Sequence, residues 1–158
     1  MTRLAQPFAL LATGMLAGVF YYGTFTVVPA FYEVPITVHL KYRVALMNHN
    51  AVYVQLLTVI AILTPLWFAI VARQAHRVRN FAFIAAIAAL LSILTTRFGN
   101  VPINRTIRVW EAGQIPSNWA DILDRWNTFN YIRTVFAFCS FLFILIASRQ
   151  RATGEKAG

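Results

Sequence analysis

Runs of apolar residues alternate with short polar segments along the chain, and four of these runs are long enough to form membrane-spanning helices. They cover about residues 7–32, 46–72, 81–97 and 126–148. A hydrocarbon core roughly 30 Å thick requires about 20 helical residues. The pattern therefore predicts an all-α fold, an integral membrane four-helix bundle, in which the whole chain (1–158) forms one transmembrane domain.

The polar connections 33–45 and 98–125 lie on the same face of the membrane in any four-span topology. We interpret 98–125 as a polar interfacial connection, and the second span begins beside the other connection. Polar and aromatic side chains that are distant in the sequence should therefore converge at one end of the bundle. This set is His39, Tyr42, Arg43, Asn48, His49, Asn50, Arg97, Asn100, Asn104, Arg105, Trp110, Trp119, Trp126, Asn130 and Arg133.

The orientation in the membrane is predicted from basic residues near the ends of the spans. Arg73, Arg77 and Arg79 occupy the tight link between the second and third spans. Short loops rich in lysine and arginine stay on the cytoplasmic side. We therefore expect both termini in the cytoplasm and a multi-pass protein of the cell (inner) membrane.

Composition narrows the class of protein further. Hydrophobic residues make up 59% and charged residues 12% of the chain, above and below the usual shares of about half and a quarter. The net charge of +9 comes from residues beside the spans, which favours a lipid bilayer as partner and no nucleic acid. The single cysteine, Cys139, excludes an internal disulfide and a cysteine metal cluster.

Three residues of the last span share one helix face. Trp126, Asn130 and Arg133 are spaced i, i+4 and i+7, which brings their side chains to one side of a helix. An arginine facing lipid there would cost at least about 2.5 kcal/mol. We expect Arg133 to face inward and to bind Asn48, Gln55 or an oxygen-rich ligand. The alternative is that it snorkels to the head groups and does nothing more.

A metal site is not expected from this sequence. His39 and His49 fall at the same end, but a metal needs further ligands, and the acidic residues show no ligand spacing. The sequence also has no glycine-rich phosphate loop.

A different hypothesis treats the protein as a non-catalytic accessory subunit of a larger membrane complex. Gly14 and Gly18 form a GxxxG pair in the first span, and such pairs allow close helix packing. Other membrane subunits would bind this face, and the polar end would bind lipid or a quinone. A transporter or channel is disfavoured because the four spans show no internal repeat.

The chain resembles the anthrone-oxygenase-like family of small four-helix membrane proteins. The resemblance rests on an apolar first helix that contains glycines and ends at a proline, on N-V-P-I-N-R at 100–105, and on R-W-x-x-x-N-x-x-R-T at 125–134. It spans nearly the whole chain. It implies the four-helix fold and, for polyketide-pathway members, oxidation of an anthrone to an anthraquinone by molecular oxygen without an established cofactor.

The resemblance also implies roles for individual residues, with a hydrophobic aromatic or quinol-like small molecule as substrate. An anthrone enolate reacts with oxygen directly, so the protein must bind a flat aromatic, stabilise the enolate and take a proton. Arg105 and Arg133 would stabilise the oxyanion, and Trp110 and Trp126 would stack on the rings. His49 would be the base.

Asn130 departs from the family pattern, in which a histidine is expected at this position. An amide cannot act as a base near neutral pH. The departure therefore either removes the oxygenase activity or leaves the base role to His49. We expect Asn48, Asn104 and Asn130 to contribute to substrate binding.

Overall fold

The computed structural model describes residues 2–156, with the side chains of residues 4–110 and 113–150. Its elements are α1 (Thr2–Tyr22), the π-helical turn η1 (Gly23–Val27), α2 (Val28–Phe31), α3 (Ile36–Val71), α4 (His76–Thr95), the π-helical turn η2 (Thr96–Asn100), α5 (Val101–Ala112) and α6 (Trp119–Lys156). The backbone stays helical through both π-helical turns. Within the described residues, four such continuous helices are long and apolar enough to cross a membrane, which confirms the predicted class.

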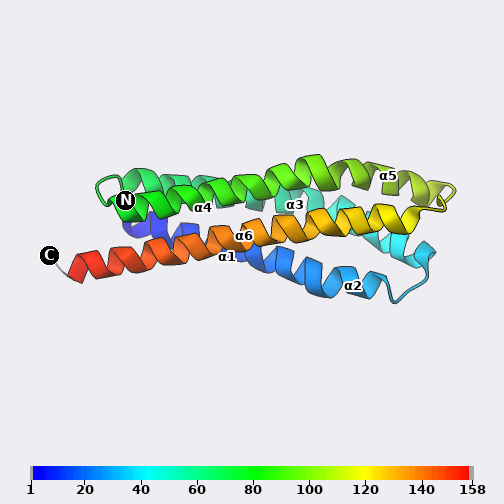
Figure 1. Ribbon diagram of the computed structural model, residues 1–158, viewed down its shortest axis with the longest axis horizontal. Helices are drawn as coiled ribbons and strands as arrows, with labels where there is room; N and C mark the ends of the chain where they lie inside the picture. The colour runs from blue at the N-terminus through cyan, green and yellow to red at the C-terminus, as the bar shows by residue number, and fades with distance from the viewer. Residues whose placement is uncertain (1, 157–158) are drawn as a thin grey trace.

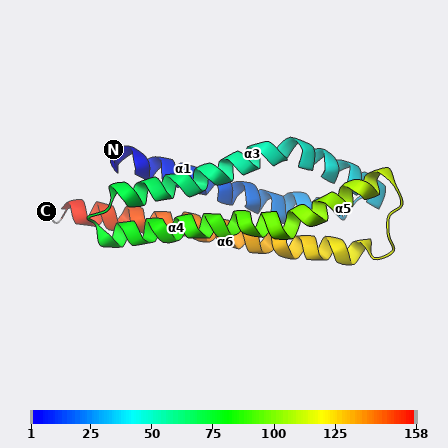
Figure 2. The same cartoon turned by 90° about the horizontal axis from the view of Figure 1, so that it is seen from above.

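The four long helices form a bundle in which α1 and α4 each pack against both α3 and α6. Figures 1 and 2 show an elongated molecule with both ends of the chain at one end. The α2 to α3 and α5 to α6 links lie together at the other end (Figure 1). The expected convergence of the polar connections is therefore confirmed, and we call this end the polar end.

The helices at the polar end are longer than the apolar runs indicated. Residues 36–45 belong to α3 and residues 101–112 form α5, where long polar connections were expected. The 36 residues of α3 correspond to about 54 Å of helix, well beyond the roughly 30 Å of a hydrocarbon core. The end of an apolar run indicates where the helix leaves the lipid. The helix itself continues as long as one of its faces remains buried.

The polar end has an apolar core of its own that supports these extensions. Leu40 and Val44 of α3 pack with Ile107 of α5 and with Leu123 and Trp126 of α6. Burial of such side chains stabilises the fold by roughly 1.5–3 kcal/mol each. At the opposite end, the core consists largely of alanines, which allow close helix approach.

The two glycines of the first span face different surroundings. A Cβ at Gly14 would lie 3.2 Å from the Phe141 ring of α6, whereas a Cβ at Gly18 would have nothing within 4 Å. Gly14 therefore serves packing inside the bundle, while Gly18 is exposed on the outer surface. The Gly14 and Gly18 face that was predicted to bind other subunits therefore lies partly inside the bundle and partly on its surface.

Candidate functional site

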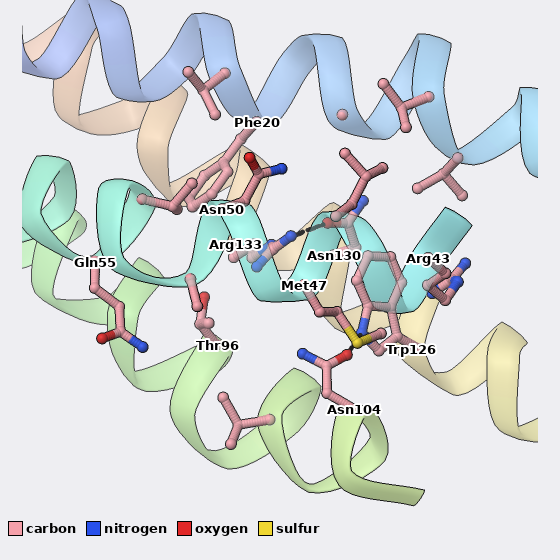
Figure 3. A pocket seen from close by; sticks show the side chains of 18 of the residues that line it. Phe20, Arg43, Met47, Asn50, Gln55, Thr96, Asn104, Trp126, Asn130 and Arg133 are labelled. Carbon is pink, nitrogen blue, oxygen red and sulfur yellow. Dashed lines mark hydrogen bonds between the residues drawn. The ribbon is translucent and has the colours of Figure 1, made fainter. Parts of the chain in front are cut away.

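The Arg133 guanidinium is held against one amide at the centre of the polar end. Its Nε and Nη2 donate to Asn130 Oδ1 at 2.9 and 2.6 Å, a contact that follows from the i, i+3 spacing on α6. The guanidinium carbon also lies 4.5 Å from the centroid of the Phe20 ring of α1. These contacts turn Arg133 into the bundle, as expected (Figure 3), but its partner is Asn130 and not Asn48 or Gln55.

Asn130 is fixed in turn by two buried threonines. Its Nδ2 donates to Thr24 Oγ1 at 2.8 Å, and Thr24 Oγ1 lies 2.8 Å from Thr134 Oγ1. Thr134 donates its hydroxyl hydrogen to the backbone carbonyl of Asn130 at 2.7 Å. Each hydroxyl has one hydrogen, so Thr24 must donate to Thr134. The network leaves Asn130 Oδ1 to accept from Arg133.

Both π-helical turns lie beside this network and supply partners to α6. Thr24 belongs to η1, and Asn100 of η2 donates from Nδ2 to the Trp126 carbonyl at 3.0 Å. A Cβ at Gly99 would lie only 2.4 Å from the Phe129 ring. Glycine at this position therefore lets η2 approach α6. π-helical turns inside α-helices are frequent at functional sites.

Trp126 lies between two arginines at the core of the polar end. The Arg43 guanidinium carbon is 4.4 Å from its ring centroid, and that of Arg133 is 5.5 Å away. Figure 3 shows Arg43 and Arg133 on either side of the ring. The indole Nε1 donates to Asn104 Oδ1 of α5 at 2.7 Å. Cation–π attraction is strengthened when the partners are desolvated, so Trp126 stabilises both charges.

Arg43 was not selected as a site residue from the sequence, and the structure places it inside the site. It is 3% exposed, and its Nε donates to Nε2 of His39, one turn earlier on α3, at 3.0 Å. His39 stacks on Phe31 and meets Tyr32 edge-on. Nη1 and Nη2 of Arg43 are buried and make no hydrogen bond within the described part of the chain.

These side chains surround a cavity of about 420 Å³, within the usual range of about 300–1,000 Å³ for small-molecule sites. Its wall is formed by α1, η1, α2, α3, η2, α5 and α6, and none of its described lining residues is acidic. The lining residues are Val19, Phe20, Gly23, Val27, Val28, Phe31, Arg43, Leu46, Met47, Asn50, Ala51, Val54, Gln55, Thr96, Val101, Asn104, Arg105, Arg108, Trp126, Asn130 and Arg133. Most of the lining is therefore apolar, and its polar part consists mainly of amides and arginines.

Four of the polar residues that line the cavity are exposed, and they define its mouth. Asn50 and Gln55 come from α3, and Arg105 and Arg108 come from α5. Asn50 and Gln55 line the cavity, where an amide is less costly than against lipid. The mouth therefore carries two cations that attract an anion toward the inner pair of arginines.

Five of the eight site residues predicted from the sequence line this cavity, namely Asn104, Arg105, Trp126, Asn130 and Arg133. Asn48 is exposed and accepts a hydrogen bond from Arg108. His49 is exposed and is not a lining residue, so its role as a base stays a prediction. Trp110 is buried in the apolar core of the polar end and does not offer a stacking face to the cavity.

More than half of the chain matches the model of a known protein family. This model, described as anthrone oxygenase, matches residues 45–143, which include Asn104, Trp126, Asn130 and Arg133. No curated protein and no solved structure matches the chain. The matched segment begins within α3 and ends within α6, and Arg43 lies two residues before its start.

Proposed function

We propose that this chain, which belongs to the anthrone oxygenase family, oxidises a hydrophobic polycyclic aromatic of the anthrone type with molecular oxygen. The observation that carries the proposal is the half-buried Arg133, held by Asn130 and Trp126 against an apolar cavity whose described lining has no carboxylate. Such a cavity favours a flat apolar molecule that carries negative charge during the reaction. We further propose that the protein acts in the cell membrane, into which its substrate partitions.

The overall reaction converts the methylene group of the anthrone to a carbonyl group. One atom of oxygen enters the product, and the other leaves as water with the two methylene hydrogens. The enolate of the substrate reacts with oxygen directly, so the protein must favour this anion and hold it. Arg133 stabilises the enolate oxygen, because a preorganised cation in a water-poor cavity interacts strongly with developing charge.

The described cavity lining contains neither a histidine nor a carboxylate to act as a base. Nearby positive charge favours the ionised form of a weak acid. Arg133 therefore shifts a bound enol toward its enolate, and the proton passes to water at the mouth beside Arg105. His49 stays a prediction as a proton acceptor outside the cavity.

Asn130 preserves the hydrogen bonding that a histidine would provide at this position. A neutral imidazole has one acceptor and one donor nitrogen, and Asn130 uses one acceptor for Arg133 and one donor for Thr24. A histidine bonded in this way would not be a free base either. The departure from the family pattern therefore supports a positioning role for this residue.

Oxygen consumption by the purified protein with anthrone tests the proposal. We expect Arg133→Gln to lower kcat/KM by about 10²–10³, the usual effect of removing one oxyanion donor. Arg73→Gln is the matched control, because Arg73 is exposed at the opposite end of the bundle. Equal rates for the wild type and Arg133→Gln would contradict the proposed site.

A further inference from the structure

Arg43 has binding capacity that the proposed oxidation does not use. Its Nε is bonded to His39, while the outer edge of the guanidinium, formed by Nη1 and Nη2, makes no hydrogen bond within the described residues. Arg43 lines the cavity and is almost completely buried. Buried polar groups in proteins are normally paired, and an unpaired buried charge is especially costly.

The guanidinium edge is presented in one fixed orientation. The bond to His39 fixes one side, and the Phe31 and Trp126 rings lie 5.5 and 4.4 Å from the guanidinium carbon. His39 accepts through Nε2, so the neutral imidazole carries its hydrogen on Nδ1. A planar fork of parallel N–H groups matches a carboxylate in bidentate geometry.

We propose that the ligand of this cavity is a polycyclic aromatic acid whose carboxylate is bound by Nη1 and Nη2 of Arg43. This inference rests on the proposed function for the reacting end of the ligand, where Arg133 meets the enolate oxygen. Both guanidinium carbons lie within 5.5 Å of the Trp126 ring centroid. One substituted three-ring aromatic is long enough to reach both cations.

Arg43 and Arg133 thus have different tasks. Two of the Arg133 nitrogens are already bonded to Asn130, which leaves it as a preorganised charge beside the reacting oxygen. Arg43 keeps an unpaired bidentate edge, buried among its neighbours, which selects the substituent when these side chains move to admit it. Arg43 lies two residues before the segment that the family model matches.

Binding of a matched pair of product analogues tests the inference without turnover. The probes are anthraquinone-2-carboxylate and anthraquinone-2-carboxamide, titrated by calorimetry into the protein in nanodiscs of a zwitterionic lipid, with empty nanodiscs as background. We expect the wild type to bind the carboxylate roughly ten- to hundredfold more tightly, the effect of a charge-assisted hydrogen bond. Equal affinities would overturn the inference even without any variant.

Variants then locate the preference within the site. Arg43→Gln should abolish it, and Arg43→Lys should retain only part of it because an ammonium group lacks the planar fork. Arg73→Gln, at the opposite end, should leave the preference intact. An undiminished preference in folded Arg43→Gln would overturn the assignment to Arg43.

Two further experiments ask whether a lipid head group occupies the site and whether ligand binding is accompanied by oxidation. The same titrations in nanodiscs that contain an anionic phospholipid should give the same preference. Its loss there would show that a lipid head group occupies Arg43 and would overturn the inference. A carboxylate preference that depends on Arg43, in a protein that consumes no oxygen with anthrone or with an anthrone carboxylic acid, would refute the proposed oxidation alone.

Discussion

Asn130→Asp changes the charge of the site while preserving the shape of the side chain. Asn130 Oδ1 already receives both hydrogen bonds from Arg133, at 2.9 and 2.6 Å, so a carboxylate would accept the same two bonds. Thr24, which now accepts from Asn130, would rotate its hydroxyl and donate to the new oxygen, and Thr134 would then donate to Thr24 in place of the Asn130 backbone carbonyl. The substitution therefore gives Arg133 a counterion without opening a hole.

The expected fall in kcat/KM follows from the loss of the uncompensated positive charge of Arg133, which would otherwise attract the enolate. Two unit charges about 4 Å apart interact by about 4 kcal/mol at an effective dielectric constant near 20. Arg43 remains in the cavity and offsets part of this loss. We therefore expect kcat/KM for anthrone to fall roughly 10- to 1,000-fold, which corresponds to about 1.4–4 kcal/mol.

The stability of Asn130→Asp should move in the opposite direction. A half-buried cation gains a carboxylate partner, so the unfolding temperature in detergent should stay level or rise. Oxygen consumption and thermal unfolding, measured on one preparation, should show lower activity together with an unchanged or higher unfolding temperature. Asn118→Asp, which places the same charge at an exposed position just before α6, should change neither quantity. Unchanged turnover by Asn130→Asp would refute an enolate beside Arg133, and a large drop in unfolding temperature would refute the hydrogen-bond network.

Two further substitutions test the supports of the site. Thr24→Val leaves the buried Asn130 Nδ2 without its acceptor, so the free energy of unfolding should fall by about 1–3 kcal/mol; an unchanged thermal unfolding curve would count against this network. Gly99→Ala places a methyl group 2.4 Å from the Phe129 ring and should cost about 1–3 kcal/mol through overpacking. Gly18→Ala, with open space around it, should leave the unfolding temperature level or slightly raise it, and equal behaviour of the two alanine variants would refute close packing at Gly99.

The fold was predictable because the hydrophobic pattern reports burial in lipid directly. Four long apolar runs gave four helices, and an even number of spans brought the polar links to one end. The ends of the helices were not predictable in the same way. Residues 36–45 are rich in polar side chains, yet Leu40 and Val44 keep one face of α3 buried beyond the hydrocarbon.

The site was predictable where it depends on spacing along one helix. Asn130 and Arg133 share a face of α6, and the structure joins them directly. Partners from other helices could not be read in this way. Thr24 is reached through a π-helical turn, which has no signal in the apolar pattern, and Arg43 was assigned to a connection that proves to be helix. The i, i+4 spacing of His39 and Arg43 was the available clue.

Because of the two π-helical turns, the polar site could be lost without loss of the four-helix bundle. A π-helical turn closes its hydrogen bonds from i to i+5 and so holds one residue more than an α-helical turn. Deletion of one residue from Gly23–Val27 would let α1 run into α2 as ordinary α-helix, with the flanking faces still directed at the same neighbours. A functioning cavity and an inert four-helix scaffold therefore stand one deletion apart in sequence.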